Sequence, residues 1–64
     1  MKELDERILR ELDHQRFGVS NYSFVMDKLD SLDKKFEFLN FLTRNRNIML
    51  KPSDIILKVK EFSE

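Results

Sequence analysis

The chain has no cysteine and no tryptophan, and its 64 residues include one glycine and one proline. Without cysteine there is no disulfide framework of the kind that supports small secreted domains, which favours a cytoplasmic location. The scarcity of glycine and proline favours helices, because these two residues interrupt them. The six Phe and one Tyr argue against low-complexity disorder, since disordered segments are poor in aromatic residues.

The chain also lacks a long apolar stretch and an excess of one charge. No run approaches the roughly 20 apolar residues of a membrane-spanning helix, and residues 1–10 lack the apolar centre of a signal peptide, so we expect no membrane association. Twelve Lys and Arg balance twelve Asp and Glu, unlike a dedicated nucleic-acid-binding protein. The distribution is uneven, because residues 1–33 hold eight acidic and five basic residues whereas residues 34–64 hold four and seven.

The spacing of apolar residues predicts an all-α protein, a single domain over residues 1–64 built as a small bundle of three to four short antiparallel helices. Leu4, Ile8 and Leu12 recur every four residues and predict a first helix from Lys2 to about Arg16. Gly18 follows at the position where a left-handed residue commonly ends a helix, and we expect it to take that role.

Two segments are compatible with alternative structures. Between residues 21 and 44 the pattern fits either one long helix or two helices, the second capped by Asp30; the polar start signal at residues 30–33 favours two. Residues 48–60 fit either a helix that begins near Pro52 or a hairpin that turns there. The helix is favoured, because Phe62 falls on the apolar side of a helix and on the polar side of a strand.

The sequence contains no pattern typical of catalysis or of metal or cofactor binding. His14 is the only histidine, and without cysteine it cannot form a structural zinc site; a place near the end of the first helix suits its charge. There is no glycine-rich phosphate loop. We therefore predict that the protein is not an enzyme, binds no metal or other cofactor and has no small-molecule substrate.

Aromatic residues are the informative excess. Residues 36–42 contain three Phe that spread too widely around a helix to share one buried face. Such rings either fill the core of a central helix or contact a partner, since exposed apolar patches mark contact surfaces. The second interpretation predicts a protein-interaction module, an adaptor or inhibitor that forms a homo-oligomer such as a homodimer or binds a larger protein. The predicted protein-binding residues are Phe24, Phe38, Phe41 and Leu57, with Arg44 and Arg46 at the rim.

The basic carboxyl half suggests an alternative, a nucleic-acid-binding accessory protein. Its basic side chains would displace counterions from phosphates. Against it, the helix expected from about Ser31 to Arg44 is dominated by apolar side chains over residues 34–42, whereas a recognition helix presents polar ones to base edges. The residues predicted for this alternative are Lys34, Lys35, Arg44, Arg46 and Lys51.

Overall fold

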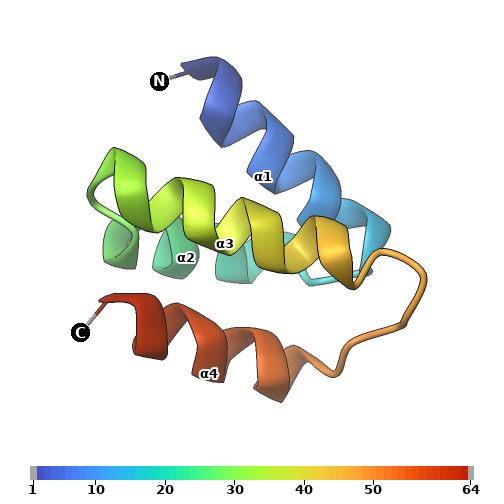
Figure 1. The fold of residues 1–64 in the computed structure, drawn as a ribbon. Helices are drawn as coiled ribbons and strands as arrows, with labels where there is room; N and C mark the ends of the chain where they lie inside the picture. The colour runs from blue at the N-terminus through green and yellow to red at the C-terminus, as the bar shows by residue number, and fades with distance from the viewer. Residues whose placement is uncertain (1, 64) are drawn as a thin grey trace.

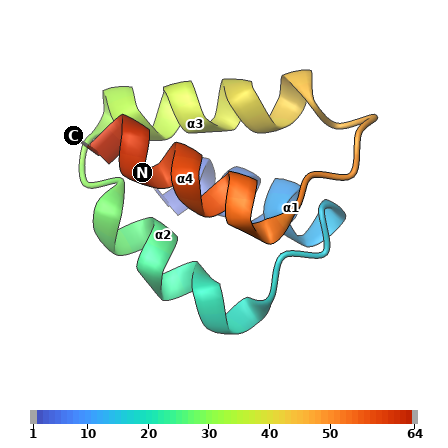
Figure 2. The ribbon, with the colours of Figure 1, turned by 90° about the horizontal axis from the view of Figure 1, so that it is seen from below.

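Four α-helices and one 3₁₀ turn make up the computed structural model, which describes residues 2–63. They are α1 (Lys2–His14), η1 (Val19–Asn21), α2 (Tyr22–Lys28), α3 (Leu32–Arg44) and α4 (Pro52–Ser63). In Figure 1, α3 crosses the middle of the molecule with α1 above it, α4 below it and α2 behind it. Consecutive helices run in opposite directions, as Figure 2 shows from below for α2, α3 and α4. The predicted all-α bundle of short antiparallel helices is confirmed.

The core draws apolar residues from every helix and from the connections between them. The α1 residues recur every four positions, as the sequence predicts, and each turns toward the centre. Along α4, Ile55 and Val59 have the same spacing and are fully buried. The buried apolar residues are Leu4, Ile8, Leu12, Phe17, Val25, Leu29, Phe38, Leu42, Ile55 and Val59.

The segment between residues 21 and 44 forms two helices, as favoured, but the cap differs from the expected one. Ser31 has an extended backbone (φ −131°, ψ 159°), and its Oγ accepts a hydrogen bond from the Lys34 amide at 3.3 Å. The prediction that Asp30 caps this helix is wrong, because its carboxylate instead accepts from Lys34 Nζ at 3.1 Å. The buried Leu29 holds the chain at the core just before this turn, which places the cap one residue later.

The favoured helix after residue 51 is also confirmed. It begins at Pro52, the first helical position, where the missing amide hydrogen of proline costs no hydrogen bond. Residues 2–63 contain no β-strand, so the hairpin alternative is wrong. None of the helices within these residues is long and apolar enough to cross a bilayer.

The end of α1 differs from the sequence expectation. Arg16, not Gly18, has the left-handed backbone (φ 59°). The Phe17 amide donates to the Leu12 carbonyl at 3.0 Å and the Arg16 amide to the Asp13 carbonyl at 2.9 Å, the two bonds of a Schellman motif. The helix ends early because this turn carries Phe17 into the core, where it is buried.

Replacing Arg16 with glycine is expected to stabilise the protein by about 1 kcal/mol, because a side chain in the left-handed region is strained by about that amount and glycine is not. Urea unfolding measures the change. The matched control is Gly18→Ala, which should have little effect because a Cβ there meets its nearest atom, Asn21 Nδ2, at an ordinary 3.5 Å. A destabilised Arg16→Gly variant would contradict the assignment of strain to this residue.

Candidate functional site: an exposed groove between α1 and α3

A groove runs between α1 and α3, which lie side by side (Figure 1). It consists of two adjoining hollows, and Arg7 lines both of them. On α3 the lining residues recur every three or four positions, so they form one stripe along the helix. We call this surface the α1–α3 groove; its lining residues are Glu3, Leu4, Arg7, Arg10 and Glu11 of α1, Leu32, Phe36, Leu39 and Thr43 of α3, and Arg46.

Large apolar side chains at one end of this groove remain exposed to solvent. Leu32 is 48% exposed and Phe36, one turn further along α3, is 52% exposed. Phe36 is the only exposed aromatic residue among those the structure describes. Full burial of such a side chain is worth about 1.5–3 kcal/mol, so the folded chain leaves a considerable part of that free energy unused here. Adjacent exposed apolar residues of this kind are typical of contact surfaces.

Arginines dominate the rim of the groove. Arg7 and Arg10 are exposed, and neither takes part in an ion pair with any residue between 2 and 63. Arg46 pairs with Glu11 instead: its Nε donates to Glu11 Oε1 at 3.1 Å and its Nη2 donates to Oε2. This hydrogen bond lowers the pKa of the Glu11 carboxyl below its usual value, although partial burial acts in the opposite direction.

The Glu11–Arg46 pair predicts a pH dependence of stability. Since the pKa of Glu11 is lower in the folded than in the unfolded chain, the unfolded chain binds more protons at acidic pH. The stabilisation is therefore complete above the ordinary value of 4.5 and is lost as the pH falls through the lower folded value. We expect wild type to be more stable than Glu11→Gln at pH 7, and the difference to narrow toward pH 3. Thermal unfolding across this range measures it.

A control variant shows whether the effect is specific to the Glu11–Arg46 pair. The exposed Asp30 also has a lowered pKa because of its hydrogen bond from Lys34, so Asp30→Asn is the control for a surface pair. Exposed pairs contribute little to stability, and this variant should follow the wild-type curve closely. A constant difference between wild type and Glu11→Gln from pH 7 to pH 3 would contradict a role for the Glu11 charge.

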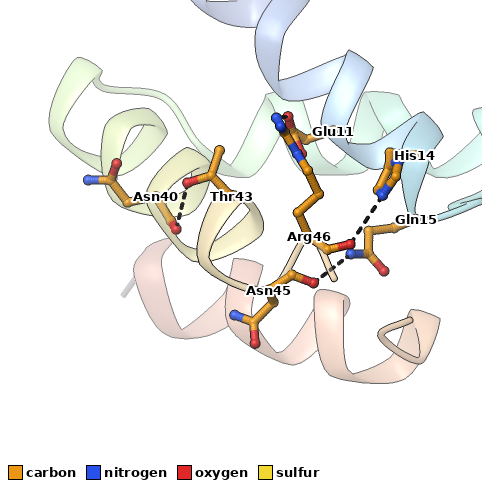
Figure 3. Close-up of polar contacts among 7 residues, drawn as sticks. All are labelled: Glu11, His14, Gln15, Asn40, Thr43, Asn45 and Arg46. Atoms are coloured by element: carbon orange, nitrogen blue, oxygen red, sulfur yellow. Dashed lines mark hydrogen bonds and ion pairs between the residues drawn. The ribbon is translucent and has the colours of Figure 1, made fainter. Parts of the chain in front are cut away.

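The end of α1 holds the loop after α3 in place through a buried amide. The Gln15 Nε2 atom donates to the carbonyls of Asn45 (3.1 Å) and Ile48 (3.0 Å), and its Oε1 accepts from the Leu50 amide at 2.8 Å. Figure 3 shows the Gln15 side chain reaching from α1 toward Asn45. One buried side chain thus satisfies three backbone groups of a loop that has no regular structure of its own.

His14 adds a contact with the same loop. It lies in the last turn of α1, as expected, and its Nε2 is 3.1 Å from the carbonyl oxygen of Arg46 (Figure 3). At the end of α3, the Thr43 hydroxyl donates to the Asn40 carbonyl at 3.0 Å. The His14 contact holds the backbone of Arg46 next to α1, at the point where the Arg46 side chain turns back to Glu11.

The predicted aromatic site residues lie apart from the α1–α3 groove. Phe38 is fully buried, so the prediction that it is an exposed contact residue is wrong. The buried face of α3 carries Phe38, Leu42 and Lys35, whose ammonium lies 2.8 Å from the Asp5 carboxylate of α1. Because Lys35 shares this face, the buried side of α3 does not stand out in the sequence as a continuous apolar stripe.

Phe41 and Phe24 are half-buried and partly covered by the chain itself. The Phe41 ring lies 6.2 Å from the Phe38 ring, and Lys58 Nζ lies 5.5 Å from the Phe41 ring centroid. Lys28 Nζ lies 5.9 Å from the ring centroid of Phe24. These cation–π contacts cover part of each ring, and the role of Phe24 and Phe41 in protein binding stays a prediction.

The remaining predicted residues are scattered. Leu57 is 61% exposed on α4 and lines neither the α1–α3 groove nor the second hollow, between α3 and α4. Arg44 lines that second hollow together with Phe41, whereas Arg46 lines the α1–α3 groove. The structure therefore brings only Arg46 of the predicted set to the groove.

The five basic residues of the nucleic-acid alternative do not form one surface. Lys34 and Lys35 lie at the start of α3, and each pairs with an aspartate. Arg44 ends α3, ten residues and so about 15 Å further along, and Arg46 is held by Glu11. Lys51 is exposed in the loop before α4.

Sequence analysis missed Leu32, Phe36, Arg7, Arg10 and Gln15 as notable residues. The three-four spacing of Leu32, Phe36 and Leu39 was visible, but it equally fits a core stripe. No group of three or more His, Asp or Glu side chains within residues 2–63 is placed to hold a metal ion. Comparisons with protein-family models, curated proteins and solved structures found no match to this chain, so its own geometry carries the functional argument.

Proposed function

We propose that this chain is a protein-interaction module that binds its partner through the α1–α3 groove. The exposed pair Leu32 and Phe36 is the observation that carries the proposal. Aromatic and arginine side chains are enriched at protein interfaces, and arginine is common at hot spots, which suits Phe36 beside Arg7. A chain of this size acts as an adaptor or inhibitor by occupying part of a larger protein's surface, and its lack of cysteine suits the cytoplasm.

A second copy of the chain is one partner that this proposal includes. Self-association would bury the same two side chains and would support a chain whose core is small. Light scattering over a range of concentrations measures the mass in solution. A dimer that is lost in Phe36→Ala would make the partner another copy, and a monomer would direct the search to other proteins.

The central test compares three proteins in affinity capture from the native host. Phe36→Ala is expected to weaken partner binding about thirty-fold, the loss of a hot spot of about 2 kcal/mol. Leu57→Ala is the matched control, because Leu57 is at least as exposed but lies outside the groove. Circular dichroism checks that both variants remain helical.

The proposal is contradicted if capture by the three proteins is equal, or if the chain neither captures a protein nor self-associates. The nucleic-acid alternative gains no support from the separated positions of its five basic residues. A titration with duplex and single-stranded DNA at low salt tests it: binding that falls steeply with salt and is lost in Arg44→Ala/Arg46→Ala would favour that alternative.

A further inference from the structure

Some of the charged side chains that line the α1–α3 groove are already paired within the chain, and others are free to pair with a ligand. Two carboxylates line it, but Glu11 is already bound to Arg46, which leaves Glu3 at one end. Arg7 lies where the two hollows of the groove meet, and Arg10 lines the hollow that Glu11 and Arg46 also line. Neither arginine has an ion-pair partner between residues 2 and 63. The middle of the groove therefore presents unpaired positive charge beside an apolar floor.

The shape of the groove suits a helix. Its lining residues on α3 extend from Leu32 to Thr43, eleven steps or about 16 Å, which equals three helical turns. The side-chain ridges of a third helix can pack between those of two neighbouring helices. Residues 2–63 contain no strand whose edge an extended peptide could join, so recognition here depends on side chains.

From these observations we infer that the α1–α3 groove binds an acidic amphipathic helix of a partner protein, an inference that rests on the proposed function. Large apolar side chains at positions i, i+3 or i+4, and i+7 of that helix pack on Leu32, Phe36 and Leu39. Asp or Glu residues beside this stripe pair with Arg7 and Arg10, because opposite charges across an interface increase both specificity and association rate.

A second copy of the chain is a poorer occupant. A two-fold interface contains the same surface from both copies, so a dimer through the groove brings Arg7 and Arg10 of both copies into one interface, where Glu3 is the only groove carboxylate not already paired. Like charges in such proximity oppose association. An acidic helix from a different protein meets these arginines with the opposite charge.

The experiment selects peptides from a display library on the folded wild-type chain. Each peptide has about 15 residues, which is long enough to form a helix that spans the groove. Apolar residues are fixed at helical spacing, and the flanking positions are randomised. We expect the selected peptides to be rich in Asp and Glu at the flanks. Their affinity should fall about ten-fold or more both in Phe36→Ala and in Arg7→Glu/Arg10→Glu.

Two controls isolate the charge effect. Arg44→Glu/Lys60→Glu makes the same change in net charge at two exposed positions outside the groove and should leave affinity unchanged. A twin of the best peptide, with its acidic residues replaced by lysine, should fail on the wild type and bind Arg7→Glu/Arg10→Glu. Recovery of binding by this double reversal would place the peptide's charges opposite Arg7 and Arg10.

The remaining outcomes separate the inference from the proposed function. Selected peptides that depend on Phe36 but have neutral or basic flanks would overturn the acidic partner and leave the groove as a binding site. A homodimer lost in Phe36→Ala would also overturn it, in favour of a second copy. If no selected peptide depends on Phe36 and the chain does not self-associate, the inference and the proposed function both fail.

Discussion

Replacing Phe38 with alanine is expected to unfold the protein. The ring is fully buried and packs against Phe41 and Phe62, at centroid distances of 6.2 and 6.3 Å. Truncation of a core phenylalanine costs about 3–5 kcal/mol through lost burial and the cavity left behind. A chain of this size has a net stability of only about 3–5 kcal/mol, so the loss is comparable with the whole. Far-UV circular dichroism at 25 °C should show loss of the helical signal.

The matched control is the same substitution two residues earlier. Phe36 lies on the same helix but is half exposed, so Phe36→Ala should stay folded and lose about 1 kcal/mol or less. The two variants therefore separate a core ring from a surface ring in one helix. A folded Phe38→Ala variant with a cooperative urea transition near that of wild type would contradict the assignment of Phe38 to the core.

The helices themselves follow from local patterns. Leu4, Ile8 and Leu12 identify the first helix because one face of it is apolar and the rest is charged, which leaves little ambiguity about the buried side. Pro52 and Phe62 similarly distinguish the last helix from a hairpin, because a helix and a strand place Phe62 on different sides. These features are encoded within a few residues of each other.

The orientation of α3 could not be predicted in the same way. The apolar residues of α3 are spread around much of its circumference, because α1 packs on one side of it and α4 on another. Its sequence therefore does not indicate one preferred buried face. The buried face includes Lys35, which is acceptable only because Asp5 of α1 lies 2.8 Å from its ammonium. A pairing between residues 30 positions apart leaves no local signal in the sequence. For this reason Phe38 was predicted as a contact residue, whereas Phe36 is the exposed ring.

The end of α1 depends on distant contacts as well. Gly18 was the obvious residue for the left-handed position, yet Arg16 takes it because Phe17 then enters the core. Gln15 appears in the sequence as one more polar residue, and its partners in the loop lie 30 to 35 positions away. Its importance is therefore visible only once α1 and the loop are brought together.

The second large effect is expected at Gln15, where glutamate is a sharper substitution than alanine. Glutamate keeps the oxygen that accepts from the Leu50 amide and replaces the amide nitrogen with a second oxygen. At neutral pH this places a buried carboxylate against the carbonyls of Asn45 and Ile48, both of which need a donor. We expect Gln15→Glu to lose about 2–4 kcal/mol at pH 7, enough to unfold much of the population.

Acidification should reverse part of this loss. Burial and the two facing carbonyls disfavour the charged form of the new carboxyl, which raises its pKa in the folded chain above that in the unfolded chain. The penalty is therefore present at high pH and disappears as the pH falls through the folded value, because the protonated acid again offers a donor. Urea unfolding of Gln15→Glu and wild type at pH 7 and pH 5 measures the change. The control is Asn47→Asp in the same loop, which should show no recovery of stability at pH 5 because residue 47 is exposed. If Gln15→Glu also recovers no stability at pH 5, then water, not Gln15, satisfies the loop carbonyls.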